Sequence, residues 1–220
     1  MRRWNGEVLG WAILGLGAGL LFGAWLGGTF GTVALWACLI VPVALAFRRG
    51  VPQGLLRFQA VDVLYGVVLG GMLRVAQGWL EVAFGSGALP SYPSLDGALP
   101  AQWWLDGLGA VIVAPAIEEF FFRGLLLIVV FTLVRRLAGN DSTGIGLGGF
   151  VAVVASAALF VLTHQLTSPV TADAAVSLTL LGIICGLLVV FTGRIWPAVL
   201  VHVVFNGTGV LLMVTGTLLG

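Results

Sequence analysis

The stretch Ala114-Pro115-Ala116-Ile117-Glu118-Glu119-Phe120-Phe121-Phe122-Arg123-Gly124 decides how the rest of the chain is interpreted. It lies inside an apolar run, Leu105–Val134, that is otherwise typical of a membrane-spanning helix. Each charged side chain at the centre of such a helix costs about 2.5–3.5 kcal/mol on insertion scales. Such charges either hold helices together as a structural ion cluster or mark a functional site. Two adjacent carboxylates favour the functional site, because one acid is enough for an ion pair.

The composition places the whole chain in a membrane. Of its 220 residues, 60% are hydrophobic and 9% are charged, and the mean hydropathy is +1.12. Soluble chains are about 25% charged. The net charge of +1 gives no indication of a nucleic-acid partner. All basic residues are arginines, a codon bias that favours a GC-rich bacterial genome, so we expect a bacterial plasma membrane.

Seven apolar runs predict an all-α, polytopic transmembrane helix bundle. The first run is longer than the 7–15 apolar residues of a signal peptide, so we expect it to be retained. Glu81–Trp104 contains three prolines and no arginine, which predicts an external loop, and Ala138–Gly149 predicts a polar, glycine-rich loop. The predicted spans are Val8–Gly28, Phe30–Phe47, Val61–Leu80, Leu105–Val134, Phe150–Gln165, Ala174–Thr192 and Ile195–Leu219.

We expect a single membrane domain with two regions. Residues 1–104 form three spans and the external loop, and residues 105–220 form four spans that carry the candidate catalytic residues.

The arginines predict the orientation. With the N-terminus in the cytoplasm, every loop arginine falls on the cytoplasmic side, as the positive-inside rule requires. If Leu105–Val134 formed two spans, Arg135 and Arg136 would lie outside, so we expect one long span and an external C-terminus. The loop arginines are Arg2, Arg3, Arg48, Arg49, Arg57, Arg135, Arg136 and Arg194.

Three features of the spans predict packing. Glycines recur every four residues in the first span, at Gly15, Gly19, Gly23 and Gly27, and such a stripe lets a second helix approach closely. We expect it to pack within the fold, with a dimer contact as the alternative. Arg74, inside the third span, is expected to be structural. Pro115 is expected to kink the fourth span, because it removes a backbone hydrogen bond.

Spacing assigns chemistry to the polar residues of the later spans. Glu119 and Arg123 are four residues apart, so they share a helix face and should pair. Glu118 is rotated by about 100° and has no local partner, which leaves a desolvated carboxylate free to act as a base. His202 and Asn206 are also four apart and place two hydrogen-bond donors side by side, an arrangement suited to an oxyanion.

The only histidines of the chain, His164 and His202, both lie in apolar spans. A lone histidine in such a place is more often a satisfied core residue. Two of them beside a double glutamate, in a chain with few polar residues, favour a site. With straight helices, however, His164 lies near the outer end of its span and His202 about 10 Å from the inner face. They meet only if helices tilt, break or start deeper, and irregular backbone at Gly144–Gly149 or Thr167–Asp173 is one way to achieve this.

Three ordered motifs resemble the CAAX-protease and bacteriocin-processing family of intramembrane proteases, which includes the type II CAAX prenyl endopeptidases. They are Glu118-Glu119-x-x-x-Arg123, Phe160-x-x-x-His164 and His202-x-x-x-Asn206, and the resemblance covers about Leu105–Gly209. It implies an all-helical membrane endopeptidase in which Glu118 and His164 activate a water molecule. His202 and Asn206 would then hold the oxyanion, with Glu119 and Arg123 as the supporting pair.

Metal dependence has two possible answers. Glu118, His164 and His202 could form a two-histidine, one-glutamate zinc site with an open position, and the family is named among metalloproteases. We favour a metal-free site, because the zinc motif His-Glu-x-x-His is absent and each ligand would come from a different helix. Asn206 is moreover a poor zinc ligand and a good oxyanion donor.

Two other classes of function remain as alternatives. A proton-coupled transporter also uses intramembrane carboxylates and histidines, but it more often shows repeated halves, which we do not find. A non-catalytic scaffold or immunity protein would not need the complete set of motif residues. The partners we expect are membrane lipid and a peptide or membrane-anchored protein substrate. In a bacterium, peptide processing is favoured over prenyl-protein processing.

Overall fold

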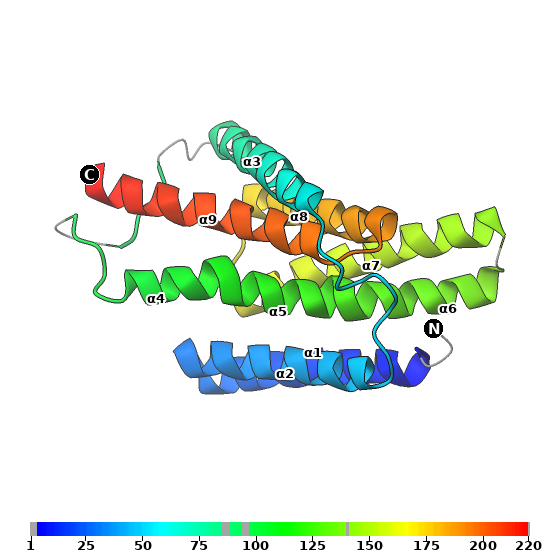
Figure 1. The fold of residues 1–220 in the computed structure, drawn as a ribbon. Helices are drawn as coiled ribbons and strands as arrows, with labels where there is room; N and C mark the ends of the chain where they lie inside the picture. Colours follow the sequence, from blue (N-terminus) through cyan, green and yellow to red (C-terminus); the bar gives the residue numbers. More distant parts are fainter. Residues whose placement is uncertain (1–3, 85–88, 94–96, 140, 220) are drawn as a thin grey trace.

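The structure is a computed structural model that describes residues 4–84, 89–93, 97–139 and 141–219. Within these residues six helices are long and apolar enough to cross a membrane. They are α1 (Gly6–Leu26), α2 (Gly28–Arg48), α3 (Ala60–Ala83), α7 (Ser142–Thr167), α8 (Ala172–Thr192) and α9 (Trp196–Leu219). A further helical rod lies between α3 and α7 in the chain (Figure 1). The predicted all-α, polytopic transmembrane bundle is therefore confirmed.

The rod corresponds to the predicted fourth span and consists of five successive segments. They are α4 (Trp103–Leu108), the π-helical η1 (Gly109–Val113), α5 (Ala114–Phe121), the π-helical η2 (Phe122–Leu127) and α6 (Ile128–Ala138). At 1.5 Å per residue the rod is about 54 Å long, well over the ~30 Å thickness of a bilayer core. The irregularity expected at Pro115 takes the form of the π turn η1, which ends directly before α5.

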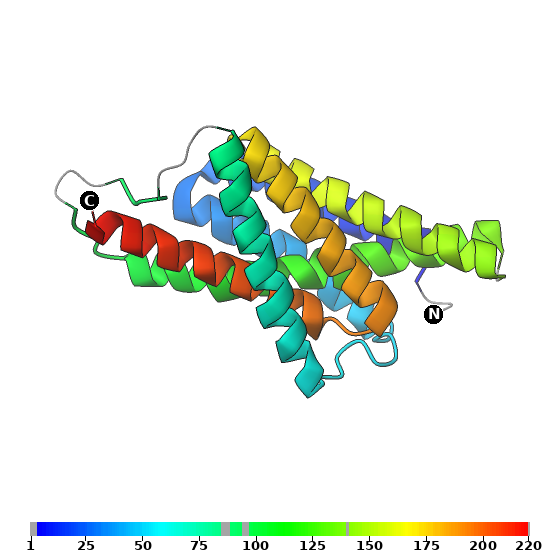
Figure 2. The same cartoon turned by 90° about the horizontal axis from the view of Figure 1, so that it is seen from above.

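The connections sort to the two ends of the bundle (Figures 1 and 2). The N-terminal end of α1, the α2–α3 connection, the α6–α7 turn and the α8–α9 turn lie toward one end, and the C-terminus and the α3–α4 connection lie at the other. The loop arginines of the described residues therefore lie toward a common end, as the positive-inside pattern requires. That this end is cytoplasmic stays a prediction.

Helices α1 and α2 form a hairpin held together by the glycine stripe. A Cβ atom at Gly15 or Gly19 would lie within 3 Å of atoms of α2, so these positions accept no side chain without movement. Gly23 approaches Gly31, and Gly27 has the positive φ of 63° needed in the turn. The stripe thus packs within the fold, as expected, and a dimer contact through it stays a prediction.

Helix α3 packs along α9 through a second close contact. Gly66 and Gly70 lie against the backbone and side chains of α9. One turn further, the Arg74 guanidinium donates to the carbonyl of Phe205 (2.6 Å) and to Gln77 Oε1 (2.8 Å). Gln77, three residues on, is thus a polar neighbour of Arg74 at helical spacing. The structural role expected for Arg74 fits these contacts.

The α6–α7 connection differs from the expected loop. Helix α7 begins at Ser142 rather than near Phe150, so the glycine-rich segment is helical and packs closely against α6. Asp141 caps the new helix by accepting from the Gly144 amide. Small residues lowered the apparent hydropathy here, but they serve a close helix–helix contact rather than a loop.

This extension and the position of the α8–α9 turn explain how the two histidines reach the same depth. Gly149 contacts Val190 near the end of α8, so the first seven residues of α7, about 10 Å, extend past that turn. The turn itself is covered by the α2–α3 connection, because the amide of fully buried Ile195 donates to the Leu55 carbonyl. Helix α9 therefore starts deeper than the ends of α6 and α7.

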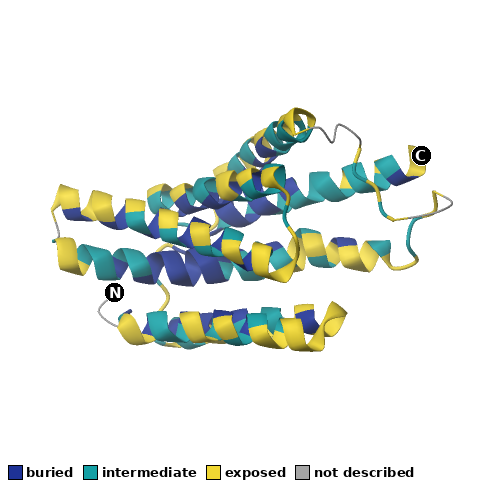
Figure 3. Cartoon of the chain, turned by 180° about the vertical axis from the view of Figure 1, so that it is seen from behind, coloured by how far each residue is buried: buried dark blue, intermediate teal, exposed yellow. Residues whose placement is uncertain are grey.

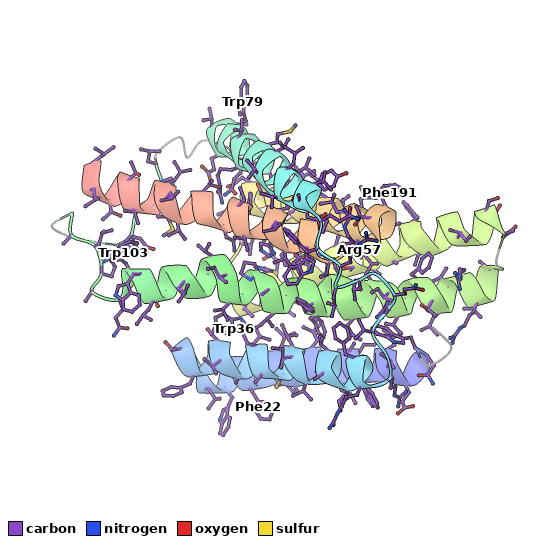
Figure 4. The ribbon with its side chains drawn as sticks, viewed as in Figure 1. Phe22, Trp36, Arg57, Trp79, Trp103 and Phe191 are labelled. Carbon is purple, nitrogen blue, oxygen red and sulfur yellow. The ribbon has the colours of Figure 1, made fainter. Side chains whose placement is uncertain are left out.

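Burial is concentrated where the helices cross the rod. All of Phe122–Leu127 is buried, and the middle of the rod is the darkest part of Figure 3. Exposed aromatic side chains such as Phe22 and Trp79 point away from the bundle (Figure 4). Trp103 is the first residue of the rod and lies at the end of the bundle where the chain has its C-terminus. These positions suit contact with lipid and a membrane interface.

Candidate active site

Glu119 and Arg123 form the buried base of the site. Their side chains are fully buried, and Arg123 Nη1 donates to Glu119 Oε1 at 2.8 Å, as their spacing predicted. Arg123 Nη2 also donates to the Gly182 carbonyl at 3.2 Å. A Cβ at position 182 would lie 3.4 Å from this nitrogen. The glycine therefore lets α8 approach the guanidinium, and the pair is anchored from two helices.

His202 lies between the two glutamates. Its Nδ1 is 2.9 Å from Glu119 Oε1, and its Nε2 is 3.8 Å from Glu118 Oε2. Because the same Glu119 oxygen accepts from Arg123, the carboxylate is an acceptor, and the imidazole Nδ1 carries the hydrogen. We expected Glu118 to have no local partner on its own helix. His202 of α9 approaches it, but the 3.8 Å separation is longer than a hydrogen bond.

His164 joins the site through the ring of Phe160. The His164 Nδ1 lies 3.0 Å from the Phe160 carbonyl, which can only accept, so Nδ1–H is the donor and Nε2 is left available. The Phe160 ring centroid is 4.5 Å from that of His164 and 5.7 Å from that of His202. Arg123 lies over the same ring at 4.6 Å. One aromatic side chain thus contacts the buried cation and both imidazoles, and Arg123 and His202 also share the Glu119 Oε1 acceptor.

Asn206 lies one turn beyond His202 on α9, and its Nδ2 donates to the Ala110 carbonyl of η1 at 2.8 Å. One of the two amide N–H bonds is therefore used within the fold, and the other is available. This contact joins the C-terminal helix to the rod eight residues before Glu118.

The structure brings Arg123, His164 and His202 together around Phe160. Glu119 bonds to Arg123 and His202, Glu118 lies 3.8 Å from His202, and Asn206 is tied to the rod. Spacing along the sequence indicated the Glu119–Arg123 pair but not the contact of His202 with Glu119. It also missed the carbonyls of Gly182 and Ala110. The available signal for Gly182 was the row of small residues on α8, which includes Cys185 and Gly186.

The residues considered for zinc do not meet as a ligand group. Among the side chains that the structure describes, no three His, Cys, Asp or Glu are grouped closely enough to hold a metal ion. His202 directs Nδ1 to Glu119, and His164 directs Nδ1 to Phe160. These two hydrogen bonds leave Nε2 of both histidines available, so it is the spacing of the three side chains, and not their hydrogen bonding, that gives no ligand group in this arrangement.

Comparison with known proteins concerns the same part of the chain. Residues 100–208 match the family model described as type II CAAX prenyl endopeptidase Rce1-like. No curated protein and no solved structure matches the chain. The matched segment begins just before the rod and ends two residues after Asn206, so it contains every candidate site residue.

Proposed function

Because residues 100–208 belong to the Rce1-like family of type II CAAX prenyl endopeptidases, we propose that this multi-pass membrane protein hydrolyses a peptide bond with a water molecule activated by Glu118 and His164. The observation that carries the proposal is the arrangement at the rod. Two adjacent glutamates have separate partners, one in a buried ion pair and the other 16% exposed beside an imidazole.

Glu118 is the base in this reaction. Its carboxylate takes a proton from water while the Nε2 lone pair of His164 orients the water, and the oxygen attacks the carbonyl carbon of the substrate. When the tetrahedral intermediate breaks, the carbon–nitrogen bond is cleaved and the proton passes from Glu118 to the leaving amine. Carboxylate and imidazole are regenerated, so no further reactant is needed.

His202 and Asn206 stabilise the negative oxygen that forms in between. With a hydrogen on Nε2 as well as Nδ1, His202 donates to the oxyanion while Glu119 holds the ring in place. Asn206 adds its free N–H. Donors that are already held in position, in a site with little water, stabilise a developing charge strongly, and removing one such donor typically costs 10²–10³ in kcat.

The substrate is a peptide or a membrane-anchored protein that reaches the site within the bilayer. Family membership supports a prenylated cysteine next to the cleaved bond, and the bacterial source expected from composition favours an unmodified peptide. Both share the hydrolysis of a peptide bond, so the substrate class can be tested separately from the chemistry.

The test uses the full chain purified into lipid nanodiscs. Two internally quenched peptides are compared, one with a farnesylated cysteine followed by three residues and one with the same sequence and no lipid, and the products are identified by mass. We expect cleavage of at least one peptide, lost in Glu118→Gln. Cleavage of only the farnesylated peptide assigns a prenyl-protein substrate. A proteomic comparison of membranes containing the active protein or Glu118→Gln extends the test to natural substrates. Equal cleavage by both proteins would contradict the proposal.

A further inference from the structure

The carbonyl of Ala110 lacks both of its possible helical donors. In an α-helix it would accept from the amide of Ala114, but that amide donates to Gly109, five residues back, in the π turn. In the π pattern it would accept from residue 115, which is proline and has no N–H. Ala110 is exposed on the surface of the bundle, and a carbonyl that faces lipid without a donor is costly, so a donor from another element is favoured.

Asn206 is that donor. Its Nδ2 lies 2.8 Å from the Ala110 oxygen, and no other hydrogen bond of this side chain is found among the described residues. The amide is thus held by α9 at one end and by the rod at the other. Side chains of an α-helix point toward its N-terminus, so the Glu118 carboxylate is directed back along the rod toward the turn that holds Asn206.

We propose that Pro115 and the π turn Gly109–Val113 position Asn206 for catalysis. They leave the Ala110 carbonyl without a backbone donor, so that it binds one N–H of the Asn206 side-chain amide. The other N–H of that amide then faces the substrate. The inference rests on the proposed function, because it assumes that the second N–H stabilises the oxyanion. Pro115 is a positioning residue here, since it acts through Asn206 and has no contact with the substrate.

Pro115→Ala tests this inference because it restores the missing backbone N–H. The new amide competes for the Ala110 carbonyl and releases Asn206. We expect kcat to fall about tenfold to a hundredfold with KM unchanged, somewhat less than the loss of a whole oxyanion donor. The melting temperature should stay the same or rise, because proline inside a helix is destabilising. A loss of activity through poorer folding would move both quantities down together.

Pro42→Ala is the matched control, because Pro42 is also inside a helix, in α2, where its ring faces Gly15 of α1. Its kcat should equal that of the unmodified protein. A direct readout is the NMR spectrum of the side-chain amides in protein labelled with ¹⁵N-asparagine. The chain has three asparagines, Asn5, Asn140 and Asn206, so few signals need to be assigned. The Asn206 amide signals should move in Pro115→Ala, and the other two should not.

A double variant separates this inference from the proposed function. If Pro115 acts through Asn206, then Pro115→Ala with Asn206→Ala loses no more kcat than Asn206→Ala alone. Losses that multiply, or an unchanged kcat in Pro115→Ala, would overturn the positioning role and leave the proposed hydrolysis standing. Full activity in Asn206→Ala would overturn the positioning role as well, while activity retained in Glu118→Gln would contradict the hydrolytic mechanism itself.

Discussion

Glu118 and Glu119 are neighbours in sequence, but one step along the helix turns their carboxylates into different surroundings. Glu119 is fully buried and accepts from both Arg123 and His202. The Glu118 side chain is partly exposed, and among the residues that the structure describes its nearest charged neighbour is His202, at 3.8 Å. The two glutamates are chemically equivalent in the sequence, but in the structure Glu119 is the one that pairs with Arg123. In the proposed reaction the base is Glu118, the carboxylate with no cation of its own.

Substitution by glutamine should affect mainly activity at Glu118 and mainly stability at Glu119. Glu118→Gln keeps the size and removes the basicity, so kcat should fall by about 10²–10⁴ while the melting temperature is unchanged. Glu119→Gln leaves the buried Arg123 charge unpaired and should destabilise the protein by about 3–5 kcal/mol. It should also lower activity, because His202 loses its acceptor. Thermal unfolding and peptide cleavage of the purified variants check both expectations, and a destabilised Glu118→Gln with normal activity would reverse the assignment.

Metal removal is the second prediction at this scale. In the proposed mechanism Glu118 and His164 activate water without a metal. We therefore expect cleavage by protein that elemental analysis shows to be metal-free, and only weak inhibition by chelators. The control is a known zinc protease in the same buffer, which the chelator must inactivate. Stoichiometric zinc in the active protein, with activity lost on its removal and regained on its return, would instead assign Glu118, His164 and His202 as ligands.

At the scale of elements, α9 is held on two sides at the level of its catalytic residues. On one side Asn206 is bonded to η1, and on the other the Phe205 carbonyl accepts from Arg74 of α3, whose guanidinium also lies 4.2 Å from the Phe205 ring centroid. The close approach of α3 depends on its glycines, because backbones can come together only where side chains are absent.

Two adjacent glycines of α3 give a matched test of this packing. A Cβ at Gly70 would lie 2.8 Å from the Val201 carbonyl oxygen, whereas a Cβ at Gly71 would meet nothing within 4 Å. Gly70→Ala should therefore destabilise the protein by about 1–3 kcal/mol through overpacking. Gly71→Ala should be neutral or stabilising by up to about 1 kcal/mol, because alanine is the better helix former. Melting temperatures in detergent that fall equally for both variants would contradict the α3–α9 contact.

For the whole molecule, the arginine-bearing connections gather toward one end and the site lies between the ends, near the middle of the rod. The α6–α7 hairpin extends beyond the α8–α9 turn (Figure 1). Arg135 and Arg136 lie on this extension. Arg194 differs from the other loop arginines, because it is bonded to fully buried Asp62 at 2.6 Å and fastens the α8–α9 turn to α3.

Topology reporters check the orientation. A fluorescent protein that folds only in the cytoplasm should be active when fused after Arg136, and a phosphatase that is active only outside should work at the C-terminus. Exchanging the two reporters provides the control, since each should then be silent. Phosphatase activity after Arg136 would contradict the seven-span topology with a cytoplasmic N-terminus.

Apolar runs, the positions of arginine and the spacing of polar residues were enough to predict the helix bundle, the single long rod and the Glu119–Arg123 pair. These features depend on local chemistry: the length of a hydrophobic run and the 3.6-residue period of a helix. The loop expected at Ala138–Gly149 was wrong for a related reason. Glycine and serine are common both in loops and in close helix contacts, and their sequence does not separate the two.

The depth of the histidines and the partners of His202 and Asn206 depended on the tertiary structure. His202 meets a glutamate 83 residues away, and Asn206 meets a carbonyl 96 residues away. Neither contact has a periodic signature, because it follows from how far one helix is shifted along another. That shift is set by the α8–α9 turn with its buried Ile195, by the extended α6–α7 hairpin and by glycines that bring helix axes together.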